Sequence, residues 1–260
     1  MNKNETKLRE KGYTIIPSYF NDAFCDKVNE AIERSYELCR EIQVENGVDD
    51  VTDGTVHHLL ATGDPVFIEL LDEITQNELY GFIQNYFGGN FILNGYGGVK
   101  NLKSKPSYVA NIHRDIRFFS GDFPLMLNML VMLDDFTLEN GATYLLPGSH
   151  LSDQKPDAEL FYRKAERATG KRGDLLLFNS NLWHAAGINE TDMERRAITI
   201  TFTKPFMKQQ LDYPRAVGYE SMNSLNPELQ QIIGFYSRTP SSLKEWYQKP
   251  ENRFYRPHQD

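Results

Sequence analysis

Apolar residues recur every three to four positions in two long segments near the start of the chain, which is the period of an amphipathic helix. Asn21 or Asp22 can cap the first helix, whose apolar positions continue to about Ile42. The second segment follows Asp64-Pro65, where proline suits the first turn of a helix. It continues until Gly88-Gly89, a pair that favours helix termination. The pattern therefore predicts two long helices near the N-terminus.

After the second helix the pattern changes to short apolar runs separated by turn residues. Asn140-Gly141 lies between two such runs and is a strong hairpin signal, and Pro147-Gly148 marks another turn. Many short strands joined by turns are typical of a β-sandwich or a jelly roll. The expected strands, including one near the N-terminus, are 13–16, 91–93, 108–112, 124–133, 142–146, 174–178 and 197–203.

No flexible linker separates the helical and β parts, so we expect a single domain over residues 1–260. Its helical N-terminal part would comprise residues 1–90, and its β core residues 91–205. Residues 206–260 would form an irregular C-terminal extension with a short helix near 227–235.

Composition and charge narrow the classes of function. Of the 260 residues, 40% are hydrophobic, which is enough for a sizeable buried core. The formal net charge of −8 argues against a nucleic-acid binder and against binding to anionic membranes, because both need a cationic face. No apolar stretch approaches the roughly 20 residues of a membrane span, and the N-terminus lacks the apolar region of a secretory signal. We therefore expect a cytoplasmic protein, a monomer or a homodimer, whose partner is a small-molecule substrate.

The two cysteines are not expected to form a disulfide. Cys25 and Cys39 both lie in the first predicted helix, so about 21 Å of helix separates them. A disulfide requires Cα atoms within about 7 Å of each other.

The tripeptide His113-Arg114-Asp115 follows one of the expected strands. In a strand, residues i and i+2 project to the same face, so His113 and Asp115 would lie together and Arg114 would point away. His184, after a later strand, is the best candidate for a third ligand. Two histidines and one carboxylate with open coordination positions are the ligand set of non-haem Fe(II) oxygenases. The other histidines are expected to hold turns or to contact solvent: His57, His58, His150 and His258.

Six short motifs occur in order along this part of the chain. They are His113-x-Asp115, Leu-Asp-Asp-Phe-Thr-Leu-Glu-Asn-Gly at 133–141, Leu-Pro-Gly-Ser-His at 146–150, Gly-Asp-Leu-Leu-Leu-Phe at 173–178, His184 and Arg195. In this order the sequence resembles the phytanoyl-CoA dioxygenase-like family of Fe(II)- and 2-oxoglutarate-dependent oxygenases. Residues 12–17 and the helix after them resemble the N-terminal segment of this family. The resemblance implies a mainly β fold with flanking helices around a double-stranded β-helix, a cupin-like jelly roll.

The resemblance also implies an activity. Fe(II), 2-oxoglutarate as co-substrate and O2 would be used to hydroxylate a small molecule of the secondary-metabolite, lipid or sugar type. His113, Asp115 and His184 would be the catalytic metal ligands. Halogenating relatives carry Ala or Gly in place of Asp115, so its carboxylate argues for hydroxylation, desaturation, epimerisation or ring formation.

Co-substrate contacts follow from the same resemblance. The family binds the far carboxylate of 2-oxoglutarate with an arginine eleven residues after the distal histidine, which is Arg195 here. Arg196 would take this role if the strand register differed, because alternate residues face opposite sides. Asn128 stands where the family often has a Gln or Asn that faces the co-substrate. The alternative is that Asn128 is a buried side chain bonded to the backbone. Ala186 and Leu130 depart from the Ser and Trp of some members, which leaves the finer contacts open.

Arg117 would share the face of His113 and Asp115 if the strand continued beyond the tripeptide. An inward arginine would bind an anion, so the hypothesis is that it contacts a substrate carboxylate or phosphate. The alternatives are an ion pair with a local acid and a turn that points it outward.

Two other classes of function stay open. A metal-dependent, non-oxidative cupin-like enzyme such as an isomerase would use the same ligands without 2-oxoglutarate; Arg195 and Asn128 argue against it. A non-catalytic binding module would need no complete set of metal ligands.

Overall fold

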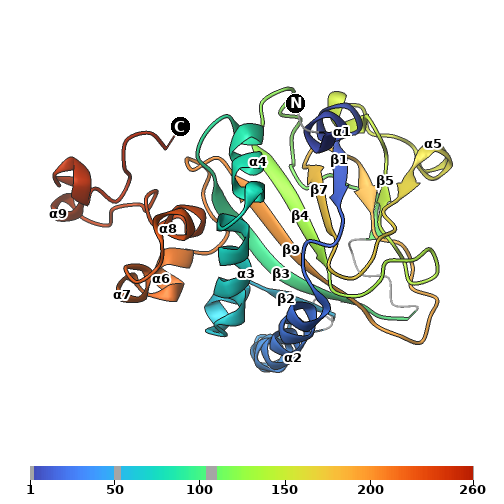
Figure 1. The fold of residues 1–260 in the computed structure, drawn as a ribbon, viewed down its shortest axis with the longest axis horizontal. Helices are drawn as coiled ribbons and strands as arrows, with labels where there is room; N and C mark the ends of the chain where they lie inside the picture. Colours follow the sequence, from blue (N-terminus) through green and yellow to red (C-terminus); the bar gives the residue numbers. More distant parts are fainter. Residues whose placement is uncertain (1–2, 50–53, 104–109, 260) are drawn as a thin grey trace. The chain divides into compact units, whose positions relative to one another are not determined.

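The computed structural model describes residues 3–49, 54–103 and 110–259 (Figure 1). The chain forms two compact units, and each is built from two separate segments. The first unit comprises Met1–His57 and Gly97–Ile200, and the second comprises His58–Tyr96 and Thr201–Asp260. The single domain expected from the sequence stays a prediction.

The strands form two sheets. Their bounds are β1 (Tyr13–Ile16), β2 (Thr55–His57), β3 (Ile92–Asn101), β4 (Met126–Met132), β5 (Tyr144–Leu145), β6 (Glu166–Arg167), β7 (Leu175–Asn179), β8 (His184–Ala185) and β9 (Arg195–Thr203). The larger sheet has the order β1-β7-β4-β9-β3-β2, and the smaller has the order β6-β5-β8. β7 pairs antiparallel with β1 and β4, and β5 pairs antiparallel with β6 and β8. The structure therefore combines antiparallel strand pairing with flanking helices, as the sequence predicts, but more of the described residues lie in helices than in strands.

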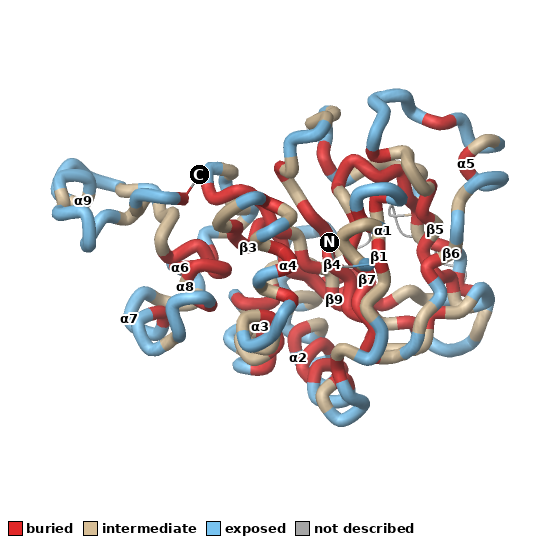
Figure 2. Tube along the Cα trace, turned by 45° about the horizontal axis from the view of Figure 1, so that its top comes forward, coloured by how far each residue is buried: buried red, intermediate tan, exposed pale blue. Residues whose placement is uncertain are grey.

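β4 and β7 form the buried centre of the first unit. Nearly every residue of both strands is buried (Figure 2). Their almost continuous apolar sequences suit strands that are covered on both faces. The pairing sets Asn128 opposite Phe178, and it thereby fixes a polar side chain within an apolar neighbourhood.

The strand predictions were correct for β1, β4, β7 and β9, whose apolar patterns extend over at least four residues. β2, β6 and β8 were not expected, because two or three residues carry too little pattern. Residues 108–109 of the expected strand 108–112 lie outside the described residues. The rest of that segment, 110–112, is not a strand, and the bridge between His113 and His184 takes its place.

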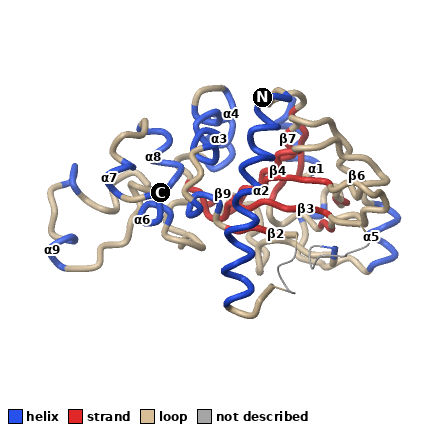
Figure 3. Tube along the Cα trace, turned by 90° about the horizontal axis from the view of Figure 1, so that it is seen from below, coloured by secondary structure: helices blue, strands red, loops and turns tan. Residues whose placement is uncertain are grey.

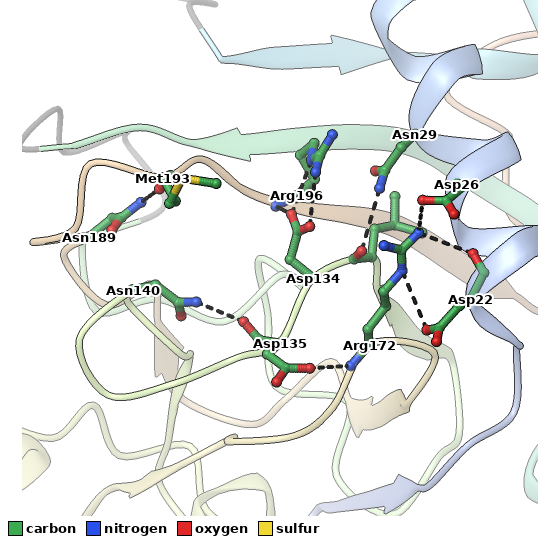
Figure 4. A network of polar contacts seen from close by, with 11 residues as sticks. Asp22, Asp26, Asn29, Asp134, Asp135, Asn140, Arg172, Asn189, Met193 and Arg196 are labelled. Atoms are coloured by element: carbon green, nitrogen blue, oxygen red, sulfur yellow. Dashed lines mark hydrogen bonds and ion pairs between the residues drawn. The ribbon is translucent and has the colours of Figure 1, made fainter.

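The hairpin predicted at Asn140-Gly141 is wrong. β4 and β5, which flank this segment, belong to different sheets. The turn itself is present: Gly141 has a φ of 81°, and the Asn140 side chain donates to the carbonyl of Asp135 (Figure 4). Asn-Gly therefore sets the local backbone conformation, whereas the packing of each strand decides which sheet it joins.

Three α-helices flank the sheets of the first unit: α1 (Lys3–Lys11), α2 (Asp22–Glu45) and α5 (Ala158–Lys164). The Asn21 side chain caps α2 by accepting a hydrogen bond from the amide of Phe24, as predicted. α2 buries one face, including Val28 and Ile32, and contacts β2. Cys25 and Cys39 are both free thiols, which confirms the absence of a disulfide between them.

The second unit is mostly helical (Figure 3). Its helices are η1 (Leu59–Thr62), α3 (Val66–Thr75), α4 (Glu78–Phe87), α6 (Tyr213–Val217), α7 (Tyr219–Met222), α8 (Pro227–Ile233), α9 (Leu243–Trp246) and η4 (Pro250–Asn252). The single helix expected after Pro65 is split into α3 and α4, because Asn77 is extended and its side chain donates to the carbonyl of Glu73. α8 and the end of α4 at Gly88 match the prediction. Across the described ranges, no helix has the length and apolar character to cross a membrane.

Candidate metal centre

His113, Asp115 and His184 lie together in the first unit. Each offers one ligand atom, and these atoms all lie within 4.8 Å of one another. Nε2 of His113 is 3.4 Å from Oδ1 of Asp115, and Nε2 of His184 is 3.7 Å from Oδ2. No second group of three such side chains occurs in the part of the chain that the structure describes.

A backbone bridge brings the two histidines together. The amide of His113 donates to the carbonyl of His184, and the amide of His184 donates back to the carbonyl of His113. Asp115 follows in a bend, and the next residue, Ile116, donates its amide to the carbonyl of Ser180. The three side chains thus converge, although the strand face that was expected to align His113 and Asp115 is not formed.

Both imidazoles are held in the same way. Nδ1 of His113 lies 2.7 Å from the carbonyl oxygen of Asn111, and Nδ1 of His184 lies 2.9 Å from that of Leu182. A carbonyl can only accept, so each Nδ1 carries the hydrogen. In the neutral form of each ring the lone pair is then on Nε2, which faces the Asp115 carboxylate, as a metal ligand requires.

The electrostatics also suit a cation. Burial opposes ionisation of Asp115, but His184, His113 and a hydrogen bond from Asn128 outweigh it, so the pKa of the carboxyl is lowered. Burial lowers the pKa of His184, which favours its neutral form. Two nitrogen ligands and one carboxylate oxygen are the donor set of mononuclear Fe(II) sites.

The other histidines lie apart from this group. The Nε2 of His150 donates to the carbonyl of Arg9, and Nδ1 of His58 lies 2.9 Å from the hydroxyl of Tyr213. His57 is part of β2, and His258 is exposed near the C-terminus.

Arg195, the first residue of β9, is a buried cation. Its side chain is packed over Phe136, with Cζ 4.2 Å from the ring centroid, and the residue is 3% exposed. Its Nε has no hydrogen-bond partner, and no carboxylate within the described ranges forms an ion pair with it. Burial lowers its pKa to about 10, so the guanidinium is still charged at neutral pH. Because an unpaired buried charge is costly, this position is suited to an anionic ligand.

Arg196 faces the other side of β9 and is already paired. Its Nε and Nη2 donate to the two carboxylate oxygens of Asp134 at 3.0 and 2.9 Å (Figure 4). The alternation expected along this strand is therefore present, and of the two arginines Arg195 is the one that lacks a carboxylate partner among the described residues.

The Asn128 amide reaches the candidate metal centre from β4. Its Nδ2 is 2.7 Å from Oδ2 of Asp115 and 3.3 Å from Oγ of Ser180. The sequence indicated Asn128 as a site residue but gave no sign of its contact with Asp115. It gave no sign of Ser180 either, because a serine after a strand is common.

Arg117 is exposed, because the strand that would have turned it inward is not formed. Its neighbour Ile116 is buried, whereas Phe118 and Phe123 are 55% and 50% exposed. The inward orientation expected for Arg117 is therefore not observed, and of the two alternatives the structure shows the outward turn rather than an ion pair with a described acidic residue.

Comparisons with known proteins give one family match and several relatives. The model of the phytanoyl-CoA dioxygenase (PhyH) family matches residues 8–197. An uncharacterized protein of Mycobacterium tuberculosis, Rv1501, is 32% identical over 94% of this chain and 90% of its own length. Dioxygenase cdmA of Talaromyces verruculosus is 27% identical over 88% of this chain and 81% of its own.

Solved structures share the fold at low sequence identity. HygX from Streptomyces hygroscopicus, solved with nickel and 2-oxoglutarate bound, has a TM-score of 0.61 and 16% identity, and the match covers 80% of this chain and 89% of HygX. AviO1 from Streptomyces viridochromogenes has a TM-score of 0.59 and 20% identity, and the match covers 79% of this chain and 95% of AviO1.

Proposed function

The chain belongs to the phytanoyl-CoA dioxygenase (PhyH) family and is an Fe(II)- and 2-oxoglutarate-dependent dioxygenase, and from this premise we propose that it hydroxylates a small molecule. His113, Asp115 and His184 would hold Fe(II) as three ligands, which leaves coordination positions open. When bound, Fe(II) supplies with 2-oxoglutarate and O2 the oxidising chemistry that amino-acid side chains lack. The two antiparallel sheets fit the jelly-roll core that the family resemblance implies.

The buried guanidinium of Arg195 is the observation that supports the proposal most directly. A planar guanidinium suits a carboxylate, to which it can donate two parallel hydrogen bonds. Arg195 is buried without a carboxylate partner in the described ranges, and it stands eleven residues after His184. A non-oxidative isomerase with the same metal ligands would have no use for this cation.

The surroundings of His184 and Arg195 are apolar. The Phe178 ring lies edge-on to His184, and the Phe136 ring lies under Arg195. Both phenylalanines belong to one buried apolar cluster with Leu130 and Ala197. Apolar walls exclude water, which strengthens the attraction between Arg195 and a carboxylate.

The substrate is proposed to carry an anionic group next to an apolar part. The segment after Asp115 exposes Arg117, Phe118 and Phe123. Arg117 pairs with no acid among the described residues, and such an arginine can bind a carboxylate or phosphate. Two exposed phenylalanine rings can cover an apolar moiety.

Succinate formation tests the proposed function. The purified protein is incubated with Fe(II), O2, 2-oxoglutarate and a panel of amphipathic acids, and succinate is quantified against incubations without each component. We expect succinate that requires all three and increases with a substrate. Conversion of a compound without 2-oxoglutarate consumption would favour the isomerase instead.

A further inference from the structure

Asp115 is the one candidate ligand that lies outside any strand or β-bridge. Residues 110–120 form no strand, and Asp115 itself lies in a bend with its side chain 34% exposed. Two backbone contacts hold the chain on either side of Asp115: the bridge between His113 and His184, and the amide of Ile116 on the carbonyl of Ser180. Both are backbone contacts, so neither determines how the Asp115 carboxylate is turned.

Asn128 holds that carboxylate from a rigid position. It lies on β4, between β7 and β9 in the larger sheet, and is 4% exposed. Its Nδ2 donates to Oδ2 of Asp115 at 2.7 Å. The second contact, 3.3 Å to Oγ of Ser180, ties the same amide to the residue whose carbonyl accepts from Ile116. The amide is therefore held at a fixed point of the sheet.

The two oxygens of Asp115 have different surroundings. Oδ2 accepts from Asn128 and lies 3.7 Å from Nε2 of His184, whereas Oδ1 lies 3.4 Å from Nε2 of His113. A carboxylate oxygen has about two lone-pair sites, so an oxygen that accepts one amide hydrogen bond has one site left for a cation. Hydrogen bonds of this kind fix the orientation of metal ligands and tune metal affinity.

We propose that Asn128 is a positioning residue that orients the Asp115 carboxylate for metal binding, and that it sets the metal affinity before 2-oxoglutarate binds. This inference rests on the proposed metal site. The proposed role differs from the sequence-based expectation that Asn128 faces the co-substrate. The proposed role acts when the metal binds, whereas the expected role would act when 2-oxoglutarate binds.

Metal titration in the absence of 2-oxoglutarate tests the inference. Co(II) is added to the metal-free protein, and binding is followed by visible absorption. Asn128→Ala removes the amide, and Asn128→Thr removes it with a side chain that suits a strand. Asn29→Ala is the matched control, because this 6%-exposed amide bonds to the carbonyl of Leu133 and touches no candidate ligand. Circular dichroism identifies the variants that are folded.

We expect the Kd for Co(II) to rise about 10- to 100-fold in both Asn128 variants and to be unchanged in Asn29→Ala. In the metal-saturated variants, the affinity for 2-oxoglutarate should change less than about threefold. Wild-type metal affinity in a folded Asn128 variant, or an equal loss in Asn29→Ala, would overturn the inference. If the wild type itself bound no metal, the proposed function would fail instead, which keeps the two failures distinct.

Discussion

The amide of His113 donates to the carbonyl of His184 at 3.0 Å, and the amide of His184 donates to the carbonyl of His113 at 2.9 Å. The two imidazole centroids consequently lie 4.2 Å apart, although 71 positions separate the residues in the sequence (184 − 113). The bridge fixes both backbones, and the carbonyls of Asn111 and Leu182 fix the two rings. Two of the three proposed ligands are thus preorganised before any metal binds.

Removal of the Asp115 carboxylate should strongly weaken metal binding. We expect Asp115→Ala to weaken Fe(II) binding more than about 100-fold, because the site loses its negative charge as well as a ligand. Anaerobic Fe(II) titration measures this, with Asp153→Ala as the control, since Asp153 pairs with Arg114 outside the group. Near-normal Fe(II) affinity of Asp115→Ala would exclude Asp115 as a ligand.

Replacement of Arg195 should separate co-substrate binding from stability. We expect Arg195→Met to raise the Kd for 2-oxoglutarate about 100-fold, because two charge-assisted hydrogen bonds of about 1.5 kcal/mol each are lost. The free energy of unfolding of the ligand-free protein should be unchanged or increase by about 1 kcal/mol, because the unpaired buried charge is removed. Calorimetric titration of the metal-loaded protein and urea denaturation measure the two effects.

Arg196→Met provides the opposite pattern. It breaks the bidentate pair with Asp134 and should lower the free energy of unfolding while the affinity for 2-oxoglutarate is kept. If Arg196→Met weakened 2-oxoglutarate binding as strongly as Arg195→Met, the assignment of Arg195 would be wrong.

The contacts of the Asp135 carboxylate should stabilise the fold at neutral pH and lose this effect in acid. Hydrogen bonds from the Lys171 side chain and the Arg172 amide lower the pKa of its carboxyl below the ordinary value of 3.8. The charged form is therefore favoured in the folded state, so this stabilisation is complete above pH 3.8 and is lost as the pH falls through the lowered pKa. We expect Asp135→Asn to cost about 0.5 kcal/mol at pH 7, because the pair is largely exposed, and less at pH 2.5.

Urea denaturation at both pH values checks this dependence. Asp122→Asn is the control, since Asp122 is exposed and has no ion pair with another described residue. An equal loss for Asp135→Asn at both pH values would show that its contacts do not depend on the charge.

Replacement of Arg117 should weaken binding of the substrate without changing the binding of Fe(II) or 2-oxoglutarate. With a substrate identified by succinate release, we expect Arg117→Ala to raise its KM about tenfold, because one charge-assisted hydrogen bond is lost, and Arg117→Lys to raise it less. Fe(II) and 2-oxoglutarate affinities should not change, since Arg117 contacts none of the candidate ligands. An unchanged KM in Arg117→Ala would remove it from the substrate site.

Local patterns in the sequence predict those parts of the fold that depend on neighbouring residues. The Asn21 cap and the apolar runs of β4, β7 and β9 are examples. The break at Asn77 was missed, because a side-chain bond to Glu73 competes with the helix there. The two-residue strand β8, which begins at His184, depends on its partners Tyr144 and Leu145 rather than on its own sequence.

The sequence predicts which residues form the candidate site better than it predicts how they are arranged. Both His113 and Asp115 were identified from the spacing of the tripeptide, but a bridge and a bend replace the expected strand. The contact between Asn128 and Asp115 joins two segments through side chains, and a single sequence holds no record of such pairs. The unpaired state of Arg195 depends in the same way on which carboxylates the fold brings near it.

The central claim is that Arg195 and the three proposed ligands form one site for Fe(II) and 2-oxoglutarate. The most direct measurement is the visible charge-transfer band of the iron chelate, recorded anaerobically after Fe(II) and then 2-oxoglutarate are added to the metal-free protein. We predict a band that requires both additions and is lost or greatly weakened in Arg195→Met at the same 2-oxoglutarate concentration. Stoichiometric Fe(II) binding without a band, or a band of equal strength in Arg195→Met, would contradict the account.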